Sequence, residues 1–147
     1  MPNDRKYTAF CGLYCKDCIP SNERLFQLLR DLEKLLIDIK FDEYAQLKAL
    51  NISSYKNYPQ FQEVLGEMKK LERKSLCTDG GCKQDCKIRK CVIEKNYEGC
   101  WECADNKTCA LLQYLKEIHS IEHNLDMIRK YGPEEWSAYR GKHYRWL

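Results

Sequence analysis

Ten cysteines in a chain of 147 residues constrain this protein more than any other feature. Such an excess has to be explained by bonding of the thiols to each other, to a metal ion or to a cluster. The first ten residues carry early charges with no apolar stretch of signal-peptide length behind them, and nowhere do about 18 consecutive apolar residues occur. We therefore expect a soluble, cytoplasmic protein without a membrane partner. In a reducing cytosol the thiols are expected to bind metal and not to form a disulfide framework.

The cysteines fall into two groups whose spacing favours a tetrahedral metal site. The N-terminal group consists of Cys11, Cys15 and Cys18. The downstream group consists of Cys77, Cys82, Cys86, Cys91, Cys100, Cys103 and Cys109. Two cysteines separated by two residues, as in Cys15–Cys18 and Cys100–Cys103, can turn back so that both sulfurs reach one ion at about 2.3 Å.

The count of three plus seven predicts that the N-terminal group takes a ligand from the downstream group, because a closed zinc site needs four ligands. All ten cysteines are candidate metal ligands. The simplest arrangement is two zinc ions with two cysteines left over. Which two are left over, and which cysteines share each ion, stays open at this point.

Apolar stripes at helical spacing predict an all-α fold with four or five helices. The expected helices cover residues 22–40, 42–50, a segment from Pro59 to Leu71, 108–131, and a short segment that opens at Pro133. Residues 77–109 are aperiodic and rich in glycine, so metal is expected to replace a core there. We expect one domain over residues 1–147, with the cysteine-rich segments 11–18 and 77–109 embedded in the helical core and stapled by zinc.

Several alternatives to zinc remain open. The spacing Cys11-x3-Cys15-x2-Cys18 is also that of the radical-SAM signature, but a leucine-striped helix and no strand follows it, which argues against that class of enzyme. An iron–sulfur cluster of another kind, or a thiol-redox role, is the main alternative. Lys69, Lys70, Arg73 and Lys74 form a basic run that suggests nucleic-acid binding as a further alternative, although zinc thiolate centres would cancel the formal charge of +3.

Other side chains that suggest chemistry give weaker signals. His119 and His123 have a spacing that lets two imidazoles on one helix share a metal. No Glu stands between them as in a zinc-protease motif, so we expect ordinary helix residues. No phosphate loop or nucleophile motif is present, and we expect no catalytic residue and no enzymatic activity.

A set of short motifs resembles one protein family when the motifs are taken together. They are Cys11-Gly-Leu-Tyr-Cys15, Cys86-Lys-Ile-Arg-Lys-Cys91, Cys100-x2-Cys103-x5-Cys109 and Tyr131-Gly-Pro-Glu-Glu-Trp136. Their combination resembles the uncharacterised cysteine-rich family DUF3795. The resemblance implies a small bacterial or archaeal cytoplasmic protein with a metal site, and it implies no established activity.

The chain departs from that family pattern at two places. The family usually has Cys-x-Gly-Cys before the Ile-Arg motif, whereas four residues separate Cys77 from Cys82 here, so Cys77 has the least support as a ligand. The family also often has proline before the last cysteine, where this chain has Thr108.

The function expected from these features is that of a zinc protein whose metal is structural and which binds a protein partner. The C-terminal aromatic residues Trp136, Tyr139, Tyr144 and Trp146 are candidates for that contact. The alternative is that these side chains close the helical core.

Overall fold

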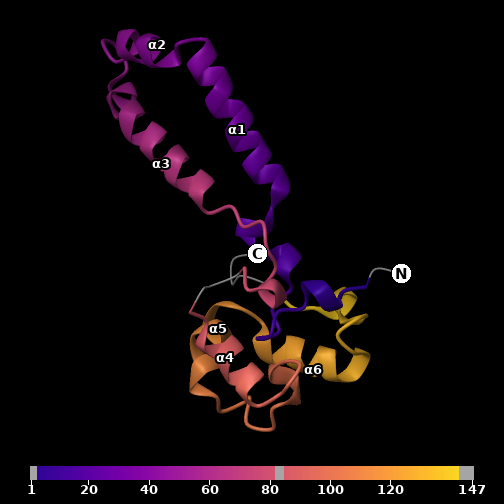
Figure 1. Ribbon diagram of the computed structural model, residues 1–147. Helices are drawn as coiled ribbons and strands as arrows, with labels where there is room; N and C mark the ends of the chain where they lie inside the picture. The colour runs from indigo at the N-terminus through magenta and orange to yellow at the C-terminus, as the bar shows by residue number, and fades with distance from the viewer. Residues whose placement is uncertain (1–2, 82–84, 143–147) are drawn as a thin grey trace. The chain divides into compact units, whose positions relative to one another are not determined.

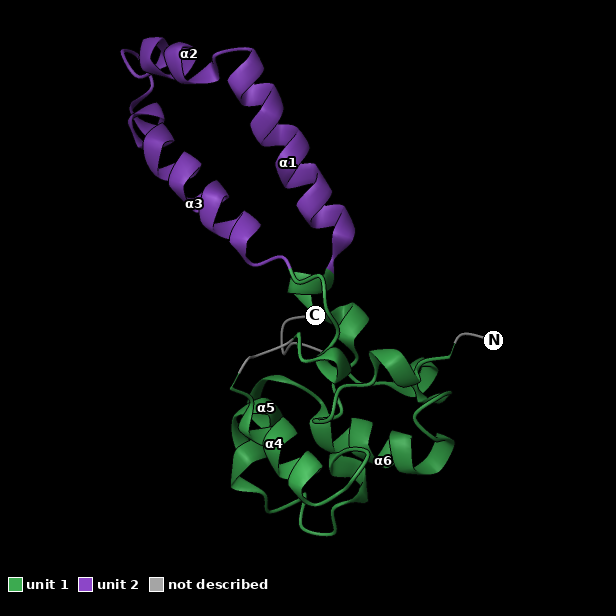
Figure 2. Cartoon of the chain, viewed as in Figure 1, with its two compact units in different colours: residues 1–21, 73–147 green, residues 22–72 purple. Residues whose placement is uncertain are grey.

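A computed structural model describes residues 3–81 and 85–142 of the chain. The chain divides into two compact units, of which unit 1 comprises residues 1–21 and 73–147 and unit 2 comprises residues 22–72 (Figure 2). The described residues form α-helices and short 3₁₀ helices, and the only extended pairing among them is an isolated bridge between Thr8 and Tyr14. The all-α prediction is confirmed. Folding as a single domain stays a prediction.

Unit 2 is a pair of long helices joined through a short one (Figure 1). Its helices are α1 (Glu23–Asp38), α2 (Phe41–Lys48) and α3 (Tyr58–Lys70), with a 3₁₀ helix, η4 (Ser53–Asn57), before α3. Their positions match the three helices expected between residues 22 and 71. The buried residues Phe26, Leu29 and Leu65 form a cluster between α1 and α3, and Ala45 of α2 and Tyr58 of α3 are also buried.

Local sequence explains where the helices of unit 2 begin and end. The side chain of Asn22 accepts a hydrogen bond of 2.9 Å from the backbone N–H of Leu25, which satisfies one of the free donors at the start of α1. Lys40, with φ of 54°, adopts a left-handed conformation between α1 and α2 and reverses the chain. Pro59 lies in the first turn of α3, where a missing N–H costs nothing.

Unit 1 has the larger core, built from helices and from irregular segments. Its α-helices are α4 (Lys87–Glu94), α5 (Gln113–Ile118) and α6 (Ile121–Tyr131). Its 3₁₀ helices are η1 (Arg5–Tyr7), η2 (Cys15–Asp17), η3 (Ile19–Ser21), η5 (Cys77–Asp79), η6 (Cys100–Glu102), η7 (Ala110–Leu112) and η8 (Trp136–Tyr139). Trp136 is fully buried, and its Nε1 donates a 2.7 Å hydrogen bond to Oγ1 of Thr8.

The N-terminal segment is held inside unit 1 by hydrogen bonds to distant residues. The N–H of Cys100 donates to the carbonyl of Phe10 at 2.8 Å, and Nδ2 of the buried Asn124 donates to the carbonyl of Gly12 at 2.9 Å. Gly12 has φ of 90°, and a Cβ there would lie 2.9 Å from Cδ2 of Leu125. Glycine is therefore required for the cysteine turn to pack against α6.

The predicted helix over residues 108–131 was wrong, because the structure breaks it into η7, α5 and α6. His119 is extended (φ −127°, ψ 158°), and the N–H of Ser120 donates to the carbonyl of Lys142 at 3.0 Å. The break lets Ile121, Leu125 and Ile128 face the core of unit 1. With α4 also present, the described residues contain six α-helices, and the expectation of four or five is not confirmed.

Two further expectations for unit 1 need correction. Residues 77–109 were expected to lack a core of their own, but Ile88 and Val92 of α4 and Trp101 belong to the main buried cluster. The sequence does not reveal the burial of Ile88 and Val92, because α4 is only eight residues long and has too few turns for a periodic signal. The last helix, expected to open at Pro133, is the 3₁₀ helix η8, which starts at Trp136.

Candidate metal centre

The two Cys-x2-Cys pairs adopt the same tight turn. Cys15 opens η2, and the N–H of Cys18 donates to the carbonyl of Cys15 at 3.2 Å. Cys100 opens η6, and the N–H of Cys103 donates to the carbonyl of Cys100, also at 3.2 Å. The tight turn expected from the spacing is present at both places.

One small cavity of unit 1 is lined by four cysteines. Cys91 comes from α4, Cys100 and Cys103 come from the η6 turn, and Cys109 immediately precedes η7. The cavity has a volume of about 70 Å³. Its other walls include Ile88, Val92, Leu111 and Leu112. We call Cys91, Cys100, Cys103 and Cys109 the four-thiol set.

A second cavity of unit 1, of about 110 Å³, is lined by the other five described cysteines. They are Cys11, Cys15, Cys18, Cys77 and Cys86, which we call the five-cysteine set. Cys15 and Cys77 are both buried and belong to one small cluster with Ala9. Cys77, which had the least support from the sequence, thus lies close to the N-terminal group.

The remaining cysteine, Cys82, lies outside the described residues. The five cysteines Cys86, Cys91, Cys100, Cys103 and Cys109 form no disulfide with one another. Within the described ranges 3–81 and 85–142, no three His, Cys, Asp or Glu side chains are arranged closely enough to hold a metal ion. The nine described cysteines thus line two cavities of unit 1.

Burial and neighbouring thiol groups control the electrostatics of the four-thiol set. Burial, followed by the charges of Cys109 and Cys103, raises the pKa of Cys100 to about 12, so its thiol is neutral at pH 7. Nζ of Lys95 lies 4.0 Å from Sγ of Cys103, and charges on Cys103 and Cys91 raise the pKa of this lysine. Lys95 is therefore placed to offset negative charge on the set.

Lys95 is not among the basic residues that the sequence singles out. Lys90, within α4, forms an ion pair with Asp85. Lys95 follows α4 and reaches Cys103 through tertiary structure, so no local signal could have identified it.

Two polar side chains hold the turn that carries Cys100 and Cys103. Nδ2 of the buried Asn106 donates to the carbonyl of Cys100 at 2.9 Å. The guanidinium of Arg129, from α6, donates to the carbonyls of Trp101 and Cys103 at 2.6 and 3.2 Å. Sequence reasoning missed both residues. A basic residue such as Arg129 is common in the last turn of a helix, so its position gives no sign of a contact with the cysteine turn.

The other candidate residues do not form a site. His119 and His123 lie on either side of the break before α6 and not on one helix, and Nε2 of His123 lies 2.7 Å from the carbonyl oxygen of Tyr139. Trp136 is fully buried, so it closes the core and is not available to a partner. Tyr139 is exposed and stacks on Tyr131 at 3.9 Å between ring centroids. Tyr144 and Trp146 lie outside the described residues.

Comparison with known proteins identifies the family. The sequence profile of a family described as "Protein of unknown function (DUF3795)" matches residues 7–114. The chain belongs to the DUF3795 family. The matched range contains all ten cysteines, while Trp136 and its motif follow after it. Neither a curated protein nor a solved structure matches this DUF3795 chain.

No helix in the described ranges has both the length and the apolar character that a membrane span needs.

Proposed function

We propose that this DUF3795 protein binds zinc through its cysteines and that the metal is structural. The observation that carries the proposal is the four-thiol set, in which three separate segments of unit 1 bring four cysteines to one small cavity. Four thiolates at about 2.3 Å in a tetrahedron are the closed coordination that structural zinc adopts. Binding would require the four side chains to rotate toward a common point.

For Cys100 and Cys103, this rotation would need little change in the backbone. Cys100 and Cys103 already share one turn, whose carbonyls are held by Asn106 and Arg129. A backbone fixed in this way leaves mainly side-chain torsions for metal binding to adjust. The positive charge of Lys95 would offset part of the net charge of about −2 on a zinc ion bound by four thiolates.

We propose a second zinc ion at the five-cysteine set. Cys11, Cys15 and Cys18 supply three ligands, and Cys77 or Cys86 would supply the fourth. This ion would join the N-terminal segment to residues far along the chain. Together the two centres account for the expected total of about two ions per chain.

The proposal extends to the setting in which the protein works. We propose a cytoplasmic, prokaryotic protein that is not an enzyme and whose metal supports a surface for a protein partner. Nucleic acid is a poorer candidate, because Lys69 pairs with Glu33 and Lys70 pairs with Glu67 at 2.6 Å. These ion pairs reduce the free positive charge of the basic run.

Elemental analysis of protein purified anaerobically and without a metal-binding tag tests the proposal. Two zinc ions per chain are expected. Cys109→Ser should lose one ion, whereas Thr108→Ser, a control at the neighbouring exposed position, should lose none. Cys15→Ser should lose the other ion. Stoichiometric iron with sulfide would replace this proposal by the iron–sulfur alternative, and a protein without metal would refute both.

A further inference from the structure

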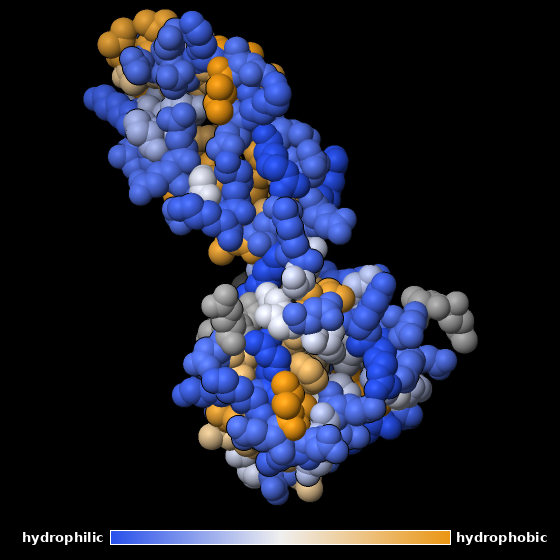
Figure 3. All heavy atoms as spheres, viewed as in Figure 1, coloured by the Kyte–Doolittle hydropathy of each residue, from blue (hydrophilic) through white to orange (hydrophobic). Residues whose placement is uncertain are grey.

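Unit 2 exposes more large apolar side chains than unit 1 among the described residues. Among the described residues, 12 of the 17 exposed large apolar side chains belong to unit 2. Some lie at the end that carries α2, where Leu47 and Leu50 are 66% and 81% exposed, and Figure 3 shows apolar surface there. Contiguous apolar patches of this kind mark interaction sites in soluble proteins.

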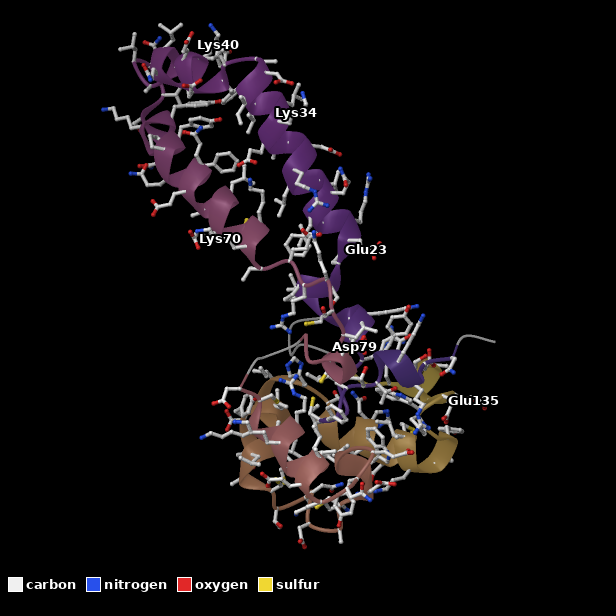
Figure 4. All side chains as sticks on the ribbon, in the orientation of Figure 1. Glu23, Lys34, Lys40, Lys70, Asp79 and Glu135 are labelled. Atoms are coloured by element: carbon white, nitrogen blue, oxygen red, sulfur yellow. The ribbon has the colours of Figure 1, made fainter. Side chains whose placement is uncertain are left out.

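Three exposed leucines of α1, with the residue that follows the helix, form a regular stripe. Leu28, Leu32, Leu35 and Ile39 follow each other at intervals of four, three and four residues and are 42–57% exposed. This spacing is that of the a and d positions of a helix that packs against another helix. It is separate from the buried side of α1, which carries Phe26 and Leu29 against α3. Charged residues such as Glu23 and Lys34 occupy other faces of α1 (Figure 4).

Helix α3 carries a matching stripe. Phe61, Val64 and Leu71 are 44–56% exposed, with the half-buried Met68 between them, at intervals of three and four residues. The two helices run in opposite directions (Figure 1), with cross-links between Glu33 and Lys69 and between Arg30 and Glu72. Successive residues of an α-helix are about 100° apart around the helix axis. By this measure, the stripe of α1 and the stripe of α3 are each displaced from the buried side of their own helix by a similar angle and in the same direction of rotation. In an antiparallel pair this places both stripes on one side of the pair.

We infer that this face binds the same face of a second copy of the chain. A twofold axis that stacks two antiparallel helix pairs gives a four-helix bundle in which neighbouring helices are antiparallel and the stripes of all four helices are buried. Two helices about 20 Å long and about 10 Å in diameter offer a face of roughly 400 Å², so a dimer would bury roughly 800 Å² in all. This area is below the roughly 1,200–2,000 Å² of a standard interface, as expected for a dimer that dissociates on dilution.

Charges along the edge of the stripe also fit a second copy. Arg24, Asp31 and Asp38 follow each other every seven residues along α1. If two α1 helices pack antiparallel across the twofold axis, Arg24 faces Asp38 of the second copy, which also pairs with Lys34 of its own helix. This favourable contact occurs twice. Asp31 faces its own counterpart once. Two attractive contacts against one repulsive contact favour antiparallel packing of the two α1 helices.

Sedimentation equilibrium of the full-length protein tests the inference. The wild-type chain is expected to be a dimer that dissociates on dilution. The double substitution Leu32→Glu, Leu35→Glu should weaken the dimer at least about 100-fold, because it places four charges in the interface. Ile93→Glu, at a position of unit 1 that is 62% exposed, is the control and should leave the dimer unchanged. Circular dichroism of each variant establishes that its helices are retained.

The orientation of the two copies has its own test. Arg24→Glu should weaken the dimer a few-fold, and adding Asp38→Arg should restore it. A monomeric wild-type protein at every concentration would overturn the inference and assign the face to a different partner. A dimer that survives the double substitution in folded protein would also overturn it. Because the dimer is measured independently of metal content, a dimeric protein without zinc would refute only the proposed function.

Discussion

The two units of this protein are held together in different ways. Unit 2 consists of helices with local start and stop signals and a small core with five buried apolar residues, and it contains no cysteine. Unit 1 contains all nine described cysteines and depends on contacts between residues far apart in sequence, such as Asn124 with Gly12 and Trp136 with Thr8. The helices of unit 2 follow from the periodic spacing of apolar residues, whereas unit 1 requires specific hydrogen bonds between residues far apart in the sequence.

Metal removal should have the largest effect and should act mainly on unit 1. Structural zinc contributes about 10–16 kcal/mol in small metal-folded domains, so verified loss of the two proposed ions should greatly lower amide protection in residues 85–109 of unit 1. The helices of unit 2 contain no proposed ligand and should keep most of their protection. Hydrogen exchange with mass spectrometry measures both regions in one experiment. Equal loss of protection in α1 and α4 would show that the two units do not differ in this respect.

Truncation of the largest buried side chain in each unit should compare their cores. Trp136→Ala and Phe26→Ala should each cost about 3–5 kcal/mol, because both side chains are almost completely buried. If the units unfold separately, each substitution should lower protection in its own unit only. Urea unfolding followed by hydrogen exchange tests this, with the exposed Tyr139→Ala as the control. Loss of protection throughout the chain from Phe26→Ala would support the single domain that the sequence predicts.

Removal of one buried side-chain hydrogen bond should lower the stability by a smaller amount, and this effect is again confined to unit 1. Asn124→Ala should cost about 1–3 kcal/mol, because it leaves the buried carbonyl of Gly12 without its donor. The same side chain also accepts a 2.8 Å hydrogen bond from the N–H of Gly141. Thermal unfolding would quantify the loss. A change below 0.5 kcal/mol, as expected for a surface substitution such as Asn51→Ala, would mean that these bonds do not hold the N-terminal segment.

The smallest predicted effect concerns the start of unit 2. Asn22→Ala should cost about 1 kcal/mol, since it removes the side chain that caps α1. Asn22→Asp keeps the acceptor and should retain the stability. Chemical unfolding of the two variants side by side is the measurement. Equal destabilisation by both substitutions would argue against a capping role.

The sequence by itself determined the features that depend on neighbouring residues. The leucine stripe and Asn22 predict α1, and the Cys-x2-Cys spacing predicts the turns at Cys15 and Cys100. Each depends on residues within a few positions of each other, whose geometry is set by backbone hydrogen bonds and side-chain periodicity. The joint pattern of cysteines was also sufficient to identify the family.

Only the tertiary structure decided how the described cysteines are sorted and which helices are interrupted. No spacing rule separates Cys86 from Cys91, which lie five residues apart on either side of the start of α4 and line different cavities. Three other features also depend on contacts between distant segments of unit 1. They are the break before α6, the burial of Trp136 and the hydrogen bonds from Arg129 to the cysteine turn. A local pattern cannot encode them, because each is stabilised by contacts between residues that become neighbours only when the chain folds.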